Sequence, residues 1–149
     1  FDSDLESWAV VGSEGVVAAH TSAYGKAALG AMKITGAGDN VGDTVDLAGS
    51  WSVGAGDTMW FWARIRDTGF SEAEWTIEVT LSTNAVGSPP TAVAAFVFTG
   101  KPYDSGWVKS SVAVFSAPAS FTNLSFFFGG STEWSIDEIY IDDIVICGD

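Results

Sequence analysis

The stretch from Thr58 to Arg66 alternates strictly between two kinds of side chain. Because successive side chains of a β-strand point to opposite faces, this period of two predicts a strand. One face is a continuous apolar row suited to a core: Met59, Phe61, Ala63 and Ile65. The other face carries two tryptophans and two arginines beside a threonine: Thr58, Trp60, Trp62, Arg64 and Arg66.

The tryptophan face has two interpretations. Tryptophan combines a large apolar ring with a polar edge, so exposed neighbouring tryptophans usually mark a binding surface. Alternatively, this face packs beneath a loop or a second sheet. The pattern of one strand leaves both interpretations open.

Similar segments recur along the whole chain. Short stretches rich in Val, Ile, Phe, Thr and Trp are separated by clusters of Gly, Asp, Asn, Ser and Pro, which is typical of an all-β protein. About ten short strands in one domain indicate a two-sheet antiparallel β-sandwich. We expect strands at 8–11, 15–20, 27–35, 41–48, 58–66, 74–82, 92–99, 107–115, 121–128 and 138–146.

Alternation also predicts which side chains of the later strands face the core. The expected core side chains are Trp75, Ile77, Val79, Leu81, Val112, Val114, Leu124, Phe126 and Phe128. The opposite face then carries polar groups with one aromatic ring: Thr76, Glu78, Thr80, Ser82, Lys109, Ser111, Asn123, Ser125 and Phe127.

If these strands pair within one sheet, their second faces form a single concave surface. Trp60, Trp62 and Arg64 would then lie beside Glu78 and Phe127. Such a surface suits a sugar ring, whose C–H bonds stack on an aromatic face while its hydroxyls take directional hydrogen bonds.

Two further tryptophans lie in predicted turns. Trp51 stands in a Ser-Trp-Ser segment before Gly54, and Trp134 follows the Gly129–Gly130 pair. Each either lines one end of the predicted cleft or folds back to cap the core.

Charge narrows the choice of partner. Six basic against nineteen acidic residues give a net charge of −13. Such a protein repels nucleic acid, anionic membranes and polyanionic polysaccharides, and favours a neutral ligand or a bound cation. No apolar run approaches the length that spans a membrane. We expect residues 1–149 to form one domain, excised from a larger secreted protein.

Little in the chain supports catalysis. His20 is the only histidine and no Gly-x-Ser-x-Gly motif accompanies it. Glycoside hydrolysis needs two carboxyl groups across a cleft, and Glu78 is the only acid that alternation places on the predicted ligand face. Cys147 is the only cysteine, which excludes an internal disulfide, and its apolar strand predicts a buried structural thiol.

Four motifs in order resemble a known group of proteins. They are Phe1–Trp8, Gly25–Leu29, the Gly106–Lys109 segment with Val112–Pro118, and Ile139–Ile144. This order resembles carbohydrate-binding modules of families four, nine and twenty-two, which share the galactose-binding-like jelly roll. The resemblance implies that fold, a β-glycan ligand and a covalently linked glycoside hydrolase. It also implies a structural calcium ion held by Asp2 and Asp142, with carbonyls around Gly25 and Lys26.

The residues themselves bear on this calcium site. Ile139 and Ile141 share one parity while Ile144 and Ile146 share the other, so a β-bulge is expected at Asp142–Asp143. Calcium prefers six to eight oxygen ligands from carboxylates and carbonyls, which this region offers. The alternative is that Asp2, Asp4, Glu6 and Asp142 are ordinary solvated carboxylates.

These observations lead to one main functional hypothesis. The domain binds a neutral β-glycan (a β-1,4- or mixed-linkage glucan, a xylan or a mannan) without catalysis, and so targets an appended extracellular glycoside hydrolase. Trp60 and Trp62 stack on the sugar, while Arg64 and Glu78 hydrogen-bond its hydroxyls. One alternative is a structural or adhesive β-sandwich whose tryptophans contact another protein domain. Another is a small-glycan lyase or hydrolase on the same fold.

Overall fold

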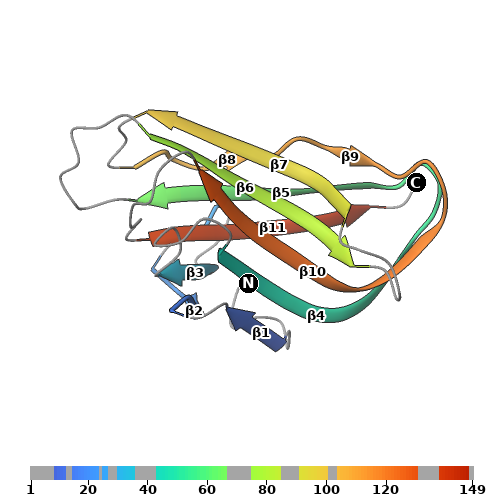
Figure 1. The fold of residues 1–149 in the computed structure, drawn as a ribbon, viewed down its shortest axis with the longest axis horizontal. Coiled ribbons are helices and arrows are strands. Elements are labelled where there is room, and N and C mark those ends of the chain that lie inside the picture. The colour runs from blue at the N-terminus through green and yellow to red at the C-terminus, as the bar shows by residue number, and fades with distance from the viewer. Residues whose placement is uncertain are drawn as a thin grey trace.

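A computed structural model describes residues 9–12, 15–23, 25–26, 30–35, 43–66, 75–84, 91–100, 104–130 and 138–147 (Figure 1). All regular elements in these ranges are strands, and the described residues contain no helix long and apolar enough to cross a membrane. The strands are β1 (Ala9–Gly12), β2 (Val17–Thr21), β3 (Ala31–Thr35), β4 (Asp43–Val53), β5 (Thr58–Arg66), β6 (Trp75–Asn84), β7 (Thr91–Gly100), β8 (Val108–Lys109), β9 (Ala113–Val114), β10 (Ala119–Gly130) and β11 (Glu138–Cys147).

The strands form two antiparallel sheets. One is five-stranded in the order β1-β4-β10-β6-β7, and the other is six-stranded in the order β2-β3-β11-β5-β8, with β9 also paired to β5. Figure 1 shows the long strands β4 and β10 curving along their length at one side of the molecule. The all-β, two-sheet antiparallel architecture predicted from the sequence is therefore confirmed.

The core lies where the inner faces of the sheets meet. Every apolar side chain of the β5 row is fully buried, as alternation predicted: Met59, Phe61, Ala63 and Ile65. From the opposite sheet, Phe126 meets Phe61 edge to face, with the ring centroids 5.2 Å apart. Leu124 is also fully buried. The central strand β10 of one sheet and the interior strand β5 of the other thus each contribute one half of this aromatic contact.

The expected pairing of β5 with β6 and β10 is wrong. β6 and β10 do pair with each other, but β5 belongs to the other sheet, between β11 and β8. Alternation assigns each side chain to a face of its own strand, but it carries no information about which strands are neighbours. The predicted single surface is consequently divided between two outer faces on opposite sides of the sandwich.

The expected strand at 107–115 is interrupted. Ser110 is buried, and its hydroxyl accepts a hydrogen bond from the Phe61 backbone N–H at 3.0 Å, while its own N–H donates to the Phe61 carbonyl at 2.9 Å. A side chain thus replaces a backbone group of the ladder and splits the segment into β8 and β9. Val112 and Val114, expected in the core, are 47% and 66% exposed, and this prediction is wrong.

The predicted bulge in the last strand is confirmed. The register of β11 against β5 shifts between Asp142 and Val145, and Asp143 adopts a φ of +46°. The resulting change of phase turns Ile144 and Ile146 toward the core. Cys147 then falls on the opposite parity and is exposed, so the expectation of a buried thiol is wrong.

Candidate functional site on two outer sheet faces

The outer face of the five-stranded sheet is centred on Phe127. This side chain lies on β10, the middle strand of the sheet, and is 41% exposed. Its backbone pairs with Thr44 of β4 on one side and with Thr80 of β6 on the other. Most large apolar residues of β10 are buried, so an exposed phenylalanine at the centre of the sheet marks a candidate contact surface.

Polar side chains surround Phe127 along β10 and β4. Asn123 and Ser125 precede Phe127 at the same parity and are half-buried. The Ser125 hydroxyl donates a hydrogen bond of 2.5 Å to Asp46 Oδ1 of the neighbouring strand. We call Thr44, Asp46, Asn123, Ser125 and Phe127 the Phe127 face. It presents one aromatic ring beside an amide, hydroxyls and a carboxylate.

Glu78 lies on the same sheet as Phe127, as expected, and pairs with Gly129 of β10 through its backbone. The structure describes the backbone of this residue only. Its predicted role in ligand binding therefore stays a prediction.

Trp60 and Trp62 lie on the outer face of the six-stranded sheet and are half-buried. Each indole has an ammonium group over its ring: Lys109 Nζ lies 4.2 Å from the Trp60 centroid and Lys26 Nζ lies 4.1 Å from the Trp62 centroid. Alternation placed Lys109 away from the core, but sequence reasoning missed the contact of either lysine with an indole. These contacts depend on strand pairing, and the register of β8 places Lys109 directly opposite Trp62.

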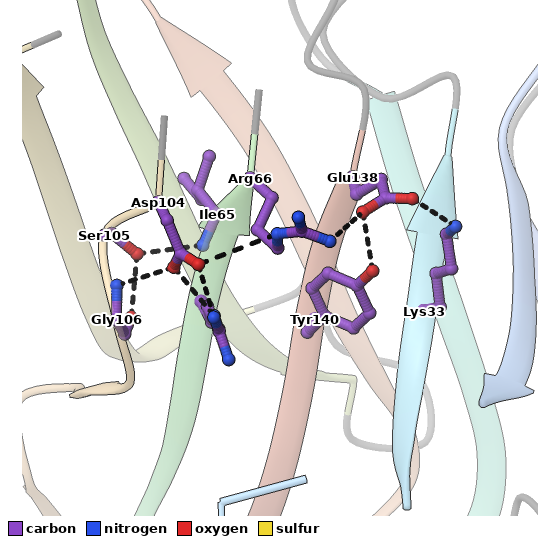
Figure 2. Close-up of polar contacts among 9 residues, drawn as sticks. Lys33, Ile65, Arg66, Asp104, Ser105, Gly106, Glu138 and Tyr140 are labelled. Atoms are coloured by element: carbon purple, nitrogen blue, oxygen red, sulfur yellow. Dashed lines mark hydrogen bonds and ion pairs between the residues drawn. The ribbon is translucent and has the colours of Figure 1, made fainter. Parts of the chain in front are cut away.

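Arg64 and Arg66 belong to a chain of ion pairs across three strands of this face (Figure 2). Arg64 Nε donates to Asp104 Oδ1 at 2.7 Å, and its Nη2 pairs with Oδ2 of the same carboxylate. Arg66 lies between Asp104 at 3.6 Å and Glu138 at 3.2 Å. Two of the guanidinium nitrogens that were expected to bind sugar hydroxyls are thus engaged by Asp104.

Glu138 lies at the far end of this chain of ion pairs, on β11. Its Oε1 pairs with Lys33 of β3, and its Oε2 accepts a 2.6 Å hydrogen bond from the Tyr140 hydroxyl. Figure 2 shows Lys33, Glu138, Tyr140, Arg66 and Asp104 forming a continuous line over β3, β11 and β5. We call these residues, together with Arg64, the ion-pair chain.

Three groups of the ion-pair chain have shifted pKa values. The hydrogen bond from Arg64 is the main reason that the pKa of Asp104 lies below its ordinary value. Burial alone would raise the pKa of Glu138, but hydrogen bonds from Lys33 and Tyr140 outweigh it and lower the pKa. Burial, and then the hydrogen bond to Glu138, raise the pKa of Tyr140 to about 12.

Trp51 caps the core. It lies within β4, not in a turn, and stacks on Phe121 with centroids 5.7 Å apart. A Cβ on Gly49 would lie 2.3 Å from the Trp51 ring, so glycine at that position leaves space for it. Trp51 thus packs against the core, and its predicted contact with a ligand stays a prediction. Trp134 lies outside the described residues.

Asp142 is the described member of the predicted calcium pair. It is 5% exposed, and its Oδ2 accepts a hydrogen bond of 2.8 Å from the Lys26 backbone N–H. The segment at Gly25 and Lys26 and the bulge therefore lie together, as the resemblance implied. Asp2 is outside the described residues, and the residues that are described contain no group of three or more acidic, histidine or cysteine side chains placed to hold a metal.

Comparisons with known proteins place the fold. No protein-family model matches the chain, and no curated protein matches it in sequence. Solved structures do match: the CBM22-2 xylan-binding domain of Paenibacillus barcinonensis Xyn10C superimposes with a TM-score of 0.58 at 15% identity, over 99% of this chain and 95% of that one. A CBM28 module specific for non-crystalline cellulose gives a TM-score of 0.64 at 10% identity, over 95% and 88%.

A third match is part of an enzyme. It is the CBM22-1–GH10 region of Clostridium thermocellum endo-1,4-β-D-xylanase 10B, complexed with xylohexaose, with a TM-score of 0.59 at 11% identity. The match covers 100% of this chain but only 27% of that one. These similarities show that the chain has the fold of the β-sandwich carbohydrate-binding modules.

Proposed function

We propose that the domain binds a neutral β-glycan on the Phe127 face, without chemical conversion. The observation that carries the proposal is the exposed ring of Phe127, on the central strand of its sheet, among hydrogen-bonding side chains. An aromatic ring supplies the apolar platform for a sugar ring, and the neighbouring hydroxyl, amide and carboxylate groups supply the directional contacts. Two of the similar structures are a xylan-binding domain and a module specific for non-crystalline cellulose.

The polar groups of this face favour a sugar without charge. Asp46 contributes a carboxylate, and the chain as a whole carries a net charge of −13. A uniformly charged acidic polysaccharide would be repelled, whereas neutral hydroxyls can donate to Asp46 or to the Ser125 oxygen and accept from the Asn123 amide. This supports a xylan or glucan over a polyuronate.

Trp60 and Trp62 remain the competing location for the same ligand. Their rings are half-buried and lie beneath lysine ammonium groups, so a sugar that stacked on the covered ring faces would have to displace those groups. The Phe127 ring is more exposed. The geometry therefore favours the Phe127 face as the main neutral-sugar platform.

The biological role would be to hold a longer protein on its polysaccharide. We propose that the chain is one module of a secreted protein that carries a glycoside hydrolase. The third structural match supports this arrangement, because there a module of this fold is joined to a GH10 module.

Affinity gel electrophoresis tests the proposal. The protein is run through gels containing xylan, β-glucan, glucomannan, xyloglucan or laminarin. We expect one class of glycan to retard the wild type. Phe127→Ala should weaken that binding about tenfold or more, because loss of a central aromatic contact usually costs about 1.4 kcal/mol or more.

Two variants serve as controls. Val112→Ala removes an apolar side chain of similar exposure elsewhere on the surface and should leave retardation unchanged. Trp62→Ala tests the competing face. Retardation that survives Phe127→Ala but disappears in a folded Trp62→Ala protein would place the binding site on the six-stranded sheet. If no glycan retards the wild type, the proposed glycan binding is wrong.

We further propose a structural calcium ion beside the bulge in β11, with Asp142 and Asp2 as carboxylate ligands. Asp142 supports the proposal, since it is a buried carboxylate next to the Gly25–Lys26 backbone, where carbonyl oxygens are available. Calcium would supply charge compensation there and tie the start of the chain to its last strand.

Thermal unfolding tests the calcium proposal. Addition of about 1 mM calcium after chelation should raise the Tm of the wild type by several degrees, because calcium would bind the folded protein and not the unfolded chain. The same addition should leave Asp142→Asn nearly unchanged. Equal melting curves of the wild type with calcium and with chelator would show that Asp142 is a hydrogen-bonding residue only.

A further inference from the structure

The basic residues of the chain are concentrated on one face. The chain has six lysines and arginines, and five of them lie over the outer face of the six-stranded sheet. They are Lys26, Lys33, Arg64, Arg66 and Lys109. In a protein with a net charge of −13, this gathering makes the face less negative than the rest of the molecule, even though Asp104, Glu138 and Asp143 lie beside four of the cations.

Most of these cations already have carboxylate partners. Lys33, Arg64 and Arg66 belong to the ion-pair chain, and Lys26 pairs with Asp143 at 3.0 Å. Such pairs fix the positions of the long side chains. The face is therefore organised before any ligand arrives, which lowers the entropic cost of binding.

Lys109 differs from the other four. Like Lys26 it is exposed and its ammonium lies over an indole ring, but no described carboxylate lies within ion-pair distance of it. An indole face attracts a cation through its quadrupole but does not neutralise its charge. The open side of this ammonium can still receive an anion.

The indoles restrict what that anion can belong to. Trp60 and Trp62 are two residues apart on one strand, so their Cα atoms stand about 7 Å apart, and both indoles lie on the face that carries Lys109. The protein's overall charge repels a dense polyanion, while a mostly neutral chain with isolated carboxylates avoids that penalty. Only the carboxylate then meets the Lys109 ammonium.

We propose that the outer face of the six-stranded sheet is a second carbohydrate surface, which recognises a uronic acid branch on an otherwise neutral glycan through Lys109 beside Trp60 and Trp62. The surface adds to the glycan binding proposed for the Phe127 face. It selects for acidic substitution, whereas the Phe127 face selects for the backbone.

A matched pair of polymers tests this proposal. Glucuronoxylan and the same glucuronoxylan after carboxyl reduction differ only in charge, and each is cast into affinity gels at low salt. We expect the wild type to bind native glucuronoxylan about two- to fivefold more tightly, the range of an exposed ion pair. This preference should fade at about 0.5 M salt, where the attraction between Lys109 and the uronic acid is screened.

Two variants with equal charge change locate the effect. Lys109→Gln should abolish the preference, while Lys33→Gln, whose ammonium is engaged by Glu138, should retain it. Binding of the carboxyl-reduced polymer reports on the Phe127 face alone and should respond to Phe127→Ala, so failure of the two proposals can be distinguished.

Three outcomes would overturn the second surface. These are equal affinity for the two polymers, a preference that survives Lys109→Gln, and no binding of native glucuronoxylan. If a poly-glutamate peptide binds in a Lys109-dependent manner and glucuronoxylan does not, the face docks an acidic protein and the proposal is wrong.

Discussion

Asp104 shows how single residues organise the outer face of the six-stranded sheet. It lies outside regular sheet structure except for one bridge to Arg66, yet it receives Arg64, Arg66 and the Gly106 N–H. Gly106 has a φ of +66°, a conformation that glycine adopts without strain. This turn therefore places a carboxylate where two arginines of β5 can reach it.

The ion pairs of Asp104 predict a pH-dependent stability difference. Because the folded pKa of Asp104 lies below the ordinary value of 3.8, the contribution of its ion pairs is fully present above that value and is lost as the pH falls through the folded pKa. Asp104→Asn should lower the free energy of unfolding by up to about 1 kcal/mol at pH 7. The free energies of unfolding of the two proteins, measured with urea, should converge once the pH lies below the folded pKa of Asp104.

A constant difference between wild type and Asp104→Asn at every pH would contradict this account. It would show that the turn depends on the side chain's shape and not on its charge. Val112→Ala, at an exposed position without ion pairs, provides the reference for an ordinary surface substitution.

Among whole elements, β11 illustrates what the sequence specifies well. Its switch of apolar parity predicted a bulge, and the structure has one at the expected pair of aspartates. The same local logic predicted the buried row of β5. Both predictions depend only on which way neighbouring side chains point along one strand, and the period of two determines that.

The failed predictions required information from distant parts of the chain. Pairing of β5 with β11 and β8 joins segments far apart in sequence, and alternation cannot choose among such partners. Ser110 broke the expected strand through a hydrogen bond to β5, which no local pattern reveals. The sequence consequently predicted a single candidate surface where the structure has two. The aromatic residues of that surface were nevertheless assigned to the correct faces of their own strands.

The bulge itself makes a testable prediction. Asp143 has a φ of +46°, which asparagine and aspartate tolerate but a β-branched residue does not. Asp143→Val should therefore reduce the free energy of unfolding by about 1–2 kcal/mol. Asp143→Asn keeps the conformational tolerance and loses only the exposed pair with Lys26, so chemical denaturation should show a change of less than half as much.

If Asp143→Val and Asp143→Asn cost the same, the loss arises from the Lys26 ion pair and not from backbone conformation. The two variants share that lost charge, which makes the comparison internally controlled.

On the scale of the whole molecule, the sandwich separates two chemically different surfaces. One sheet presents Phe127 with neutral and acidic polar groups, and the other presents tryptophans among organised cations. The core between them holds both faces rigid through contacts such as Phe61 with Phe126. A rigid, preformed surface suits a module that binds a polymer without converting it.

The central claim is that a neutral glycan binds across the Phe127 face. The most direct measurement is an amide ¹H–¹⁵N chemical-shift titration with a soluble oligosaccharide of whichever glycan retards the protein. We predict that the shifts cluster at Thr44, Asp46, Asn123, Ser125 and Phe127. Shifts confined to Trp60, Trp62 and Lys109, or saturating shifts nowhere in the protein, would contradict the account.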